Sequence, residues 1–430
     1  MNENPRSLKV VATAIDPIYI GTGGYTIGRV DNTIVRDPIS NLPKIPGSSL
    51  AGTWRYYVAL EAIRKIGETL KDKFTKLTEE LKTAQVISEN LDSNQKEIIF
   101  ADLWSMGKSI SAFLETQNRE LFNKIKEFWE REISNPDQWE FFEENRYLKI
   151  TCAGQDNLPQ ENLENAPFAQ KNGKSGHCGH CLVCKGFGFS KKDLSWQGML
   201  FFSDLEIVFF PVFTMEGTKW VTTEGIIERL AEKYNIFVSD NPPSNPPVCI
   251  KCQENISEDE REGHINLGWL YLPYKLETCQ QVKEVLDKIE ENSERRIPIT
   301  LNDIVIVPDH LFSHIVNSNL EVRTSVSIDP LTGSAKEGAL FTSEAIPRGT
   351  ILHGEIRIFD KSKLGELESK IKPLPEAEKL ESALKETKKY YETLGIGGMT
   401  TRGFGRMRIE LQNGNSGGSR TDTPDGGGGE

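Results

Sequence analysis

The 430-residue chain has 63 acidic and 51 basic side chains, so its formal net charge is −12. This charge argues mildly against a nucleic-acid partner, because binding to phosphates needs local cations. The cations are spread unevenly, however, since residues 395–409 contain Arg402, Arg406 and Arg408 but no acid. An acidic average can therefore conceal a basic groove.

No apolar run reaches the length of a membrane-spanning helix, and the first residues lack the apolar segment of a secretory signal. We therefore expect a soluble, cytoplasmic protein with no membrane partner. The length exceeds that of one average domain, which predicts one or two hydrophobic cores together with insertions.

The first elements expected along the chain are a strand, a glycine-rich loop and a helix. Residues 8–15 alternate apolar side chains as a half-buried strand does, and residues 20–32 form the glycine-rich loop. Residues 45–66 place apolar side chains at helical spacing, with Ser48 or Ser49 as the expected N-cap.

The middle of the chain is expected to contain two insertions on either side of a central strand. Residues 67–150 are charged and helical in period, which predicts a helical insertion, and residues 236–319 form a second insertion. Between them, the largely apolar residues 198–212 predict a central strand. Residues 220–234 return to helical spacing, with Thr222 or Thr223 as the expected cap.

The C-terminal third is expected to add strands, a helix and a tail. Residues 325–333 and 338–359 have the pattern of strands, and residues 380–394 predict a helix that ends at Gly395. The glycine-rich residues 413–430 have little apolar surface to bury, so we expect a disordered tail there.

Each half of the chain thus gives the order strand, loop, helix, strand once the insertions are set aside. This order predicts an α+β fold with a ferredoxin-like or RRM-like core. We assign residues 1–66, 185–235 and 320–412 to this core.

Residues 151–184 are expected to form a linker and a zinc knuckle. Cys178, Cys181 and Cys184 are separated by two residues each, a spacing that wraps thiolates around one ion, most often zinc. Four protein ligands would leave no open coordination position, so this zinc would be structural.

The fourth ligand is left open by the spacing. His177 or His180 can supply it, and Cys249 and Cys252 can complete this site or form half of a second one. A redox-active CxxC is the alternative, but it lacks the strand–helix–strand context of such proteins. Without a leader sequence, the cysteines are expected to be reduced thiols rather than disulfides. Plain thiols are expected at the two remaining cysteines, Cys152 and Cys279.

Two glycine-bearing segments offer backbone groups to a phosphate chain. A helix start that includes Gly47, Ser48 and Ser49 presents N–H groups and hydroxyls to an anion. Near the other end, glycines let a second backbone approach closely, and Arg402 and Arg406 supply cations. The glycines of this C-terminal segment are Gly395, Gly397, Gly398, Gly403 and Gly405. Taken alone, an ordinary helix cap or an ordinary turn explains each segment.

The segment VDNTIVRDPISNLPKIPGSSLAGTWR, residues 30–55, resembles the backbone subunits of type III CRISPR effector complexes, which are members of the RAMP superfamily. Further matches follow in order: GMLFFSD from residue 198, SIDPLTGSAKEGALFTSEAIPRGT from residue 327 and GIGGMTTRGFGRM from residue 395. The resemblance implies an RRM-like fold and an RNA-binding role, and the two long insertions indicate a divergent member.

The implied partners are a CRISPR guide RNA, a target RNA, other RAMP subunits and the large polymerase-like subunit of the complex. The resemblance also favours a zinc site of one histidine and three cysteines. The residues implied to contact RNA are Gly23, Gly24, Arg36, Gly47, Ser48, Ser49, Arg55, Gly397, Gly398, Arg402, Gly403 and Arg406.

Asp31 is the catalytic candidate. In the resembled family, the carboxylate at this place supports cleavage of target RNA by attack of the neighbouring ribose 2′-hydroxyl, with a divalent cation such as Mg or Mn. Such cleavage needs a group near the phosphate that binds a cation or accepts a proton. The plainer interpretation is that Asp31 and Asn32 only form a turn. Asp37, between Arg36 and Pro38, is expected to be a turn residue or half of an ion pair.

Two alternatives remain open to the sequence. One is a structural RNA-binding subunit without nuclease activity of its own. The other is a guide-processing endonuclease, but such enzymes use an early histidine as general base, and residues 1–60 contain none. The chain also departs from the family pattern at Ala51, where lysine is usual, and at Tyr19, where a histidine is frequent.

Overall fold

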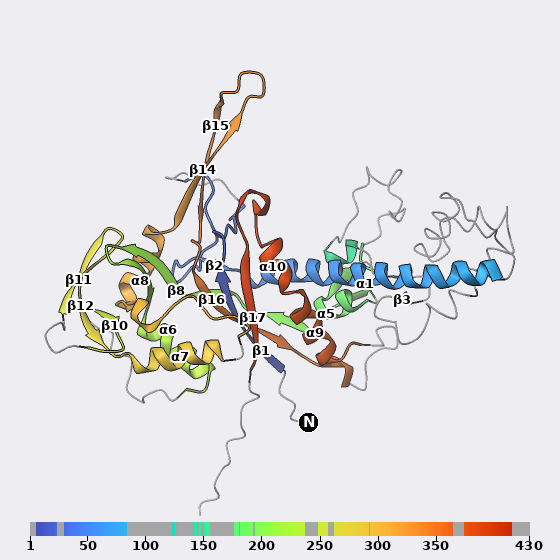
Figure 1. Cartoon of the computed structure of the whole chain (residues 1–430), viewed down its shortest axis with the longest axis horizontal. Coiled ribbons are helices and arrows are strands. Elements are labelled where there is room, and N and C mark those ends of the chain that lie inside the picture. Colours follow the sequence, from blue (N-terminus) through green and yellow to red (C-terminus); the bar gives the residue numbers. More distant parts are fainter. Residues whose placement is uncertain are drawn as a thin grey trace, which may run out of the picture. The chain divides into compact units, whose positions relative to one another are not determined.

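The chain divides into two compact units in the computed structural model (Figure 1). Unit 1 comprises Met1–Leu50, Phe201–Ile358 and Lys388–Glu430, and unit 2 comprises Ala51–Leu200 and Phe359–Thr387. No described helix is long and apolar enough to cross a membrane. The structure describes residues 6–23, 30–83, 123–124, 127, 142–143, 146–147, 150–154, 176–179, 181–191, 194–236, 248–256, 262–291, 293–363 and 374–414.

Unit 1 is built on a mixed sheet that contains the predicted first strand. β1 (Arg6–Ala14) runs antiparallel to β16 (Ile351–Ile358) on one side and to β17 (Met407–Asn413) on the other. Val10 is fully buried and lies opposite Gly354 of β16. The two ends of the chain therefore pair directly in the core of this unit.

The main sheet has the strand order β11-β12-β10-β13-β9-β8-β16-β1-β17. Its other members are β8 (Leu205–Thr214), β9 (Gly217–Thr222), β10 (Cys249–Cys252), β11 (Glu262–Leu267), β12 (Leu270–Glu277) and β13 (Ile304–Ile306). Off this path, β2 (Lys44–Ile45) pairs with β8, and β7 (Leu200–Phe202) pairs with β16. The expected strand 198–212 is thus divided into β7 and β8. Residues 236–319, expected as a second insertion, contribute strands to this sheet.

The helices of unit 1 are α6 (Glu224–Lys233), α7 (Gln280–Glu290), α8 (Asp309–Ser318) and α10 (Lys389–Thr393), with single turns at η4 (Leu301–Asp303) and η6 (Thr400–Arg402). Thr222 or Thr223 was expected to cap α6, and the cap is Thr223, whose Oγ1 accepts from Ile226 N at 3.3 Å. With its large sheet and its helices, the fold is mixed α+β, as predicted.

A separate two-stranded hairpin joins β14 (Glu321–Ile328) to β15 (Ala335–Ala345). Figure 1 shows it extending away from the main sheet. It carries exposed apolar side chains at Val322, Val326, Ile328, Leu331, Leu340 and Phe341. Because a lone hairpin cannot bury such side chains, they are available for contact with another molecule.

Unit 2 contains most of α1 (Gly47–Thr83), which begins in unit 1 and continues beyond Ile66, where we expected it to end. Trp54 of α1 is fully buried, and its Nε1 donates to Oγ1 of Thr387 in α9 (Ala377–Thr387) at 3.0 Å. The other elements are β3 (Phe142–Glu143), β4 (Arg146–Tyr147), η2 (Ile150–Ala153), α5 (Leu182–Phe187), β5 (Phe189–Lys191), β6 (Leu194–Trp196) and η5 (Lys361–Lys363). Most of the expected insertion 67–150, and the expected tail beyond Gly414, lie outside the described residues.

Candidate functional site

Asp31 lies at the base of the β14–β15 hairpin, where Thr342 of β15 fixes its carboxylate. The Thr342 backbone N and the Thr342 Oγ1 both donate to Asp31 Oδ2 at 2.8 Å. In return, the backbone N of Asp31 donates to Thr342 Oγ1 at 3.0 Å. The side chain is exposed to solvent, yet its orientation is set by the two bonds to Oδ2.

The second carboxylate oxygen, Oδ1, accepts no hydrogen bond from the described residues. The backbone N–H and the hydroxyl of Thr342 stabilise the charged form, and they hold the pKa of Asp31 below its usual range. A carboxylate whose charged form is stabilised, and whose Oδ1 accepts no bond from the described residues, suits a cation ligand better than a proton acceptor.

Asn32 attaches the loop to the hairpin next to Asp31. Its backbone N donates to Thr342 O at 3.0 Å, and its carbonyl accepts from Glu344 N at 3.1 Å. The Asn32 Nδ2 also donates to Ser343 Oγ at 3.2 Å. The loop is therefore joined to β15 by an isolated parallel bridge between Asn32 and Ser343.

Arg36, which the resemblance implies to contact RNA, forms its described contacts with side chains of unit 1. Its NH2 lies 2.7 Å from Oε2 and 2.9 Å from Oε1 of Glu344, and its Nε donates to Asn317 Oδ1 at 2.9 Å. The Glu344 side chain is only 9% exposed, so this ion pair is mostly shielded from water. Such contacts position the loop that carries Asp31.

Asp37 is a turn residue, as the sequence predicted. Its Oδ1 accepts from Ser40 N and from Ile39 N at 3.0 Å each, and its Oδ2 lies 3.1 Å from Lys44 Nζ. These bonds lower the pKa of Asp37 to about 2, and the bond from Ser40 N has the largest effect.

The C-terminal glycine turn lies against the start of the N-terminal loop. Gly398 N donates to Tyr19 O at 3.0 Å, and Gly405 N donates to Pro17 O at 2.8 Å. Gly397 has a φ of +81°, and a Cβ there would lie 2.2 Å from Tyr19 O. The C-terminal glycine turn therefore lies directly against Pro17 and Tyr19, which precede the glycine-rich loop, and Gly397 is required for that approach.

The hairpin also contacts the C-terminal turn. Arg323 of β14 donates from NH1 to Gly403 O at 3.0 Å, and its guanidinium lies 4.8 Å from the centre of the Phe404 ring. In the hairpin, Arg323 is opposite Ser343, the residue after Thr342. The Asp31 loop and the C-terminal turn thus both join the hairpin at its base.

The two predicted arginines of this turn differ in their partners. Arg402 is exposed and forms no side-chain hydrogen bond or ion pair within the described part of the chain. Arg406 forms a two-fold ion pair with Asp16, from Nε to Oδ2 at 2.5 Å and from NH2 to Oδ1 at 3.0 Å. Arg402 is therefore the free cation of the turn.

The start of α1 is capped differently from our expectation. The helix begins at Gly47, before Ser48 and Ser49, so neither serine is its N-cap. Instead, Gly47 N donates to Asp204 Oδ1 at 2.7 Å, and Asp204 Oδ2 also pairs with Lys44 Nζ at 2.7 Å. A protein carboxylate therefore occupies part of the anion site that we expected for a phosphate.

The remaining residues predicted to bind RNA differ in exposure. Gly47 is buried, and a Cβ there would lie 2.5 Å from Phe202 O. Ser48 and Gly23 are exposed, whereas Ser49 is half-buried. Gly24 lies outside the described residues.

In unit 2, four cysteines gather into one cluster. The sulfur atoms of Cys152, Cys178, Cys181 and Cys184 all lie within 4.8 Å of one another. The Sγ atoms of Cys178 and Cys184 are 3.9 Å apart, close to the separation of about 3.8 Å that four thiolates adopt around one zinc ion. The cluster could therefore hold a metal such as zinc.

The members of the cluster come from η2 and from the segment leading into α5. Cys181 is the N-cap of α5, and its Sγ accepts from Cys184 N at 3.5 Å. Cys152, which we expected to be a plain thiol, is fully buried and supplies the fourth sulfur. Burial raises the pKa of the Cys181 thiol, so thiolates here need a nearby cation.

The histidines proposed as the fourth ligand are not part of this group of sulfurs. His177 Nδ1 lies 3.9 Å from Cys184 Sγ and 3.0 Å from Arg55 NH2. Arg55, implied to contact RNA, also donates from Nε to Cys152 O at 2.8 Å. Arg55 thus supports the cluster from α1. His180 lies outside the described residues.

The other cysteine pair belongs to unit 1 and does not match a metal site. Cys252 forms a disulfide with Cys279, which corrects our expectations of a metal ligand at Cys252 and of reduced cysteines throughout. Cys249 is buried and unpaired. Over the described residues, the four-cysteine cluster is the one place where three or more potential metal ligands gather. The β10–β12 register brings Cys252 beside Glu277, two residues before Cys279, and this pairing is not visible in the sequence.

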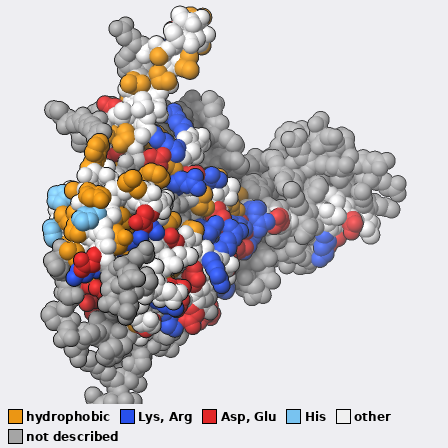
Figure 2. All heavy atoms as spheres, turned by 60° about the vertical axis from the view of Figure 1, so that its left-hand side comes forward, with side chains coloured by type: hydrophobic (Ala, Val, Ile, Leu, Met, Phe, Trp, Pro, Cys, Tyr) orange, Lys and Arg blue, Asp and Glu red, His pale blue; other side chains and the backbone are white. Residues whose placement is uncertain are grey.

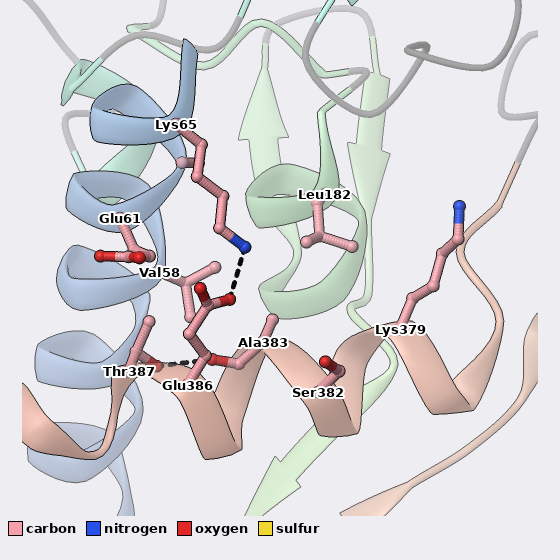
Figure 3. A pocket seen from close by; sticks show the side chains of 10 residues that line it. Val58, Glu61, Lys65, Leu182, Lys379, Ser382, Ala383, Glu386 and Thr387 are labelled. Atoms are coloured by element: carbon pink, nitrogen blue, oxygen red, sulfur yellow. Dashed lines mark hydrogen bonds and ion pairs between the residues drawn. The ribbon is translucent and has the colours of Figure 1, made fainter. Parts of the chain in front are cut away.

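A small cavity in unit 2 lies between α1, α5 and α9 (Figure 3). It has a volume of about 160 Å³, and its lining includes Glu61, Lys65, Leu182 and Glu386. Lys65 Nζ lies 2.5 Å from Glu386 Oε2 and Glu61 pairs with a neighbouring arginine of α1, so these charges are largely neutralised within the unit.

Comparison with known proteins gives the family. The family model described as RAMP superfamily matches residues 11–408, and this chain belongs to that superfamily.

Two curated relatives match over part of their length. A segment of 44 residues is 52% identical to the CRISPR system Cms endoribonuclease Csm3 of Enterococcus italicus, covering 10% of this chain and 21% of that protein. A region of 168 residues is 24% identical to the CRISPR system Cmr endoribonuclease Cmr4 of Pyrococcus furiosus, covering 39% of this chain and 57% of that protein. The matches thus span 21% and 57% of these relatives.

Among solved structures, oligomeric Cmr4 from Pyrococcus furiosus aligns with a TM-score of 0.41 and 15% identity, covering 95% of this chain and 99% of that chain. A chain of the type III-B Cmr-beta complex bound to cognate target RNA aligns with a TM-score of 0.42 and 14% identity, covering 94% and 96%.

Sequence reasoning missed two residues that complete these sites. Thr342 lies 311 positions after Asp31, and neither its type nor its neighbours indicate that contact. Cys152 stands 26 residues before Cys178, beyond any common ligand spacing. Its identity as a fourth cysteine in the same half of the chain was the available signal.

Proposed function

We propose that this chain is a guide-RNA-binding subunit of a type III CRISPR ribonucleoprotein, and that Asp31 supports cleavage of the bound target RNA. The observation that carries this proposal is the exposed Asp31 carboxylate, with Oδ1 free, at the base of the hairpin. The names of the Csm3 and Cmr4 relatives, both endoribonucleases, support it. Its partners would be the guide and target RNAs, other RAMP subunits and a large polymerase-like subunit.

The RNA grip is proposed to combine backbone contacts with a few cations. Gly397, Gly398 and Gly403 lie in an exposed or half-exposed turn beside Arg402, which can pair with a phosphate. The exposed apolar side chains of the hairpin can contact bases, whose faces offer stacking surfaces. Gly23, Ser48, Ser49 and Arg406 would add contacts, while Gly47, Arg36 and Arg55 would position the elements that carry them.

The proposed reaction is attack of a ribose 2′-hydroxyl on the adjacent phosphate, which releases the 5′-oxygen of the next nucleotide. A divalent cation, Mg or Mn, would supply charge neutralisation at that phosphate when bound. Asp31 Oδ1 is the oxygen of this chain available to orient it, while Thr342 keeps Oδ2 engaged. Because the pKa of Asp31 is lowered, we assign Asp31 to orientation rather than to removal of the hydroxyl proton.

We further propose that Cys152, Cys178, Cys181 and Cys184 hold a structural zinc ion. The separations of the sulfurs support this, and four protein ligands leave no open position for chemistry. His177 would then lie beside the metal rather than on it. The finer fold assignment, an RRM-like core in a divergent member with insertions, belongs to the same proposal.

The test is to map cut positions on a guide-matched RNA with complexes that contain wild-type chain or Asp31→Ala. We expect the variant to lose cleavage at the position served by this chain while guide binding is unchanged. Chelation of Mg or Mn should stop the same cut without releasing the zinc.

The alternative is a structural subunit in which Asp31 only attaches the loop to the hairpin. The three bonds between Asp31 and Thr342 favour this role, because they are the contacts that a purely structural attachment of the loop needs. An unchanged cut pattern in Asp31→Ala would establish it.

A further inference from the structure

The disulfide of unit 1 fixes the start of helix α7. Cys252, at the end of β10, is bonded to Cys279, the N-cap of α7, and their Cα atoms are 5.5 Å apart. Cys279 has a φ of +41°, a left-handed conformation that a residue with a Cβ adopts only when its surroundings impose it. Its side chain forms no capping hydrogen bond to the first turn of the helix. The position of this helix start therefore depends on the covalent bond to β10.

The other end of α7 holds the strand that follows the C-terminal glycine turn. Nε2 of Gln412 in β17 donates to Ile289 O at 2.6 Å and to Glu291 O at 3.1 Å. Gln412 is 7% exposed and Ile289 is fully buried, so these bonds are shielded from water. They satisfy carbonyl groups that the end of a helix leaves without partners inside the helix. In this way α7 braces β17, which begins directly after the turn at Met407.

The segment that follows α7 holds the helix on the other side of the same turn. Nζ of Lys388, the N-cap of α10, lies 2.8 Å from Oε1 of Glu294 and 3.0 Å from Oε2 of Glu410. Arg295 NH1 lies 3.4 Å from Oε2 of Glu392 in α10. Figure 2 shows one face of the molecule, on which acidic and basic side chains lie interspersed. Exposed ion pairs contribute little individually, so these contacts brace α10 only while α7 stays in place.

The disulfide can be reduced from the side of Cys279. Cys252 is fully buried, whereas Cys279 is half-buried, so a thiolate from solvent reaches the sulfur of Cys279 first. Attack there forms a mixed disulfide with Cys279 and releases Cys252 as a thiolate, which takes up a proton. The second thiol of a dithiol then displaces Cys279, so the dithiol leaves as a disulfide and both cysteines become thiols. Cys279 is then free to leave its left-handed conformation, and the start of α7 moves with it.

We propose that the Cys252–Cys279 disulfide is a redox-sensitive switch for the C-terminal glycine turn. While the bond is closed, α7 braces both flanks of the turn. Reduction by a dithiol releases the start of α7 and weakens the grip of the turn on guide RNA. Coupling between two sites needs an element with two arrangements that both sites bias, and α7 is that element. The switch rests on the proposed function for the identity of its ligand, guide RNA.

The first test measures amide hydrogen exchange by mass spectrometry on the full chain, with the disulfide intact and after treatment with a dithiol. Reduction should quicken exchange in residues 280–291 roughly tenfold or more, because it removes a crosslink between cysteines that are 27 residues apart. Exchange in the flanks of the turn, residues 388–394 and 407–413, should also quicken. The double variant Cys252→Ser/Cys279→Ser should exchange like the reduced chain and should not respond to the dithiol.

The matched control is Cys249→Ala, which removes a buried and unpaired cysteine from the same strand. It should exchange like wild type and keep its response to the dithiol. Zinc content is measured in every sample, because the thiols of the reductant compete for a metal at the cysteine cluster of unit 2. A response of the double variant to the dithiol would assign the effect to that cluster and overturn the proposal.

The second test measures the affinity of the same samples for guide RNA. Affinity should fall about fivefold or more on reduction and in the double variant, and oxidised Cys249→Ala should bind like wild type. Faster exchange confined to the start of α7 would overturn the switch, as would an affinity that reduction leaves unchanged. Absence of the Cys252–Cys279 crosslinked peptide from a non-reducing digest would overturn it as well. If α10 and β17 respond to reduction but the oxidised chain binds no guide RNA, the proposed function fails while the coupling through α7 stands.

Discussion

The Asp31 region of unit 1 and the cysteine cluster of unit 2 are assembled in different ways. The cluster takes three of its four sulfurs from one segment, with Cys178, Cys181 and Cys184 two residues apart. The Asp31 region takes its parts from an N-terminal loop, a hairpin more than 300 positions away and a C-terminal turn. Local spacing therefore reveals the first site, whereas only the family order of motifs points to the second.

The two regions also differ in what fixes the functional group. In the cluster, burial and a shared ion would hold the sulfurs, so the metal and the fold depend on each other. At Asp31, two donors on Thr342 fix an exposed carboxylate without any metal. Loss of one member should therefore affect folding in unit 2 and chemistry in unit 1.

The largest expected effect is that of Cys152→Ser. It removes one thiolate from a buried site, so we expect loss of bound zinc and a fall in the free energy of unfolding on the order of 3 kcal/mol or more. Metal content after dialysis and urea unfolding measure these two quantities. The contrasting variant is His177→Asn, which should keep one zinc ion per chain. If Cys152→Ser kept its full zinc content and His177→Asn lost it, His177 rather than Cys152 would be the fourth zinc ligand.

The fourth sulfur also marks the limit of what the sequence could predict. The strand 6–14 and a threonine cap before α6 follow from local pattern and were predicted near their observed places, whereas the single helix expected over 380–394 is divided into α9 and α10. Thr342 could not be predicted, because only the folded chain creates its contact with Asp31. For Cys152 the residue type was a signal, but its distance along the chain from Cys178 concealed the contact. The same limit explains Arg36 and Arg55, which were assigned to RNA by motif but bond to Glu344 and to Cys152 O.

A smaller effect is expected from Thr342→Val, which removes the hydroxyl but keeps the size and the backbone N–H of residue 342. The carboxylate of Asp31 would lose one of the donors that orient it, so target cleavage should slow by about tenfold to a hundredfold. Guide binding and the cation requirement should remain. Single-turnover cleavage rates over a range of Mg or Mn concentrations provide the measurement. The matched control is Thr324→Val, which alters the threonine opposite Thr342 in the hairpin.

The pH dependence should separate orientation from a structural contact. The pKa of Asp31 is lowered in the folded chain, so the carboxylate stays ionised as the pH falls toward the ordinary range of aspartate. In Thr342→Val one stabilising donor is gone, so the pKa should rise toward its usual value and the loss of cleavage should begin at a higher pH. If the cleavage rates of wild type and variant fell over the same range of low pH, the result would contradict a role of the Asp31 charge in the reaction.

The smallest expected effect compares the two kinds of arginine. Arg402 is exposed and forms no bond with the described residues, so Arg402→Ala should remove one phosphate contact. The affinity for guide RNA should then fall about threefold to tenfold. The slope of log affinity against log salt should decrease by about one.

The contrasting variant is Arg36→Ala. Arg36 is bound to Glu344, whose side chain is 9% exposed. Arg36→Ala should therefore lower the free energy of unfolding by about 1–3 kcal/mol and leave the salt slope unchanged. Salt titrations of RNA binding measure the slope, and urea unfolding of both variants measures the free energy of unfolding. A slope that changes in Arg36→Ala but not in Arg402→Ala would mean that the hairpin base opens on binding and that Arg36 exchanges Glu344 for a phosphate.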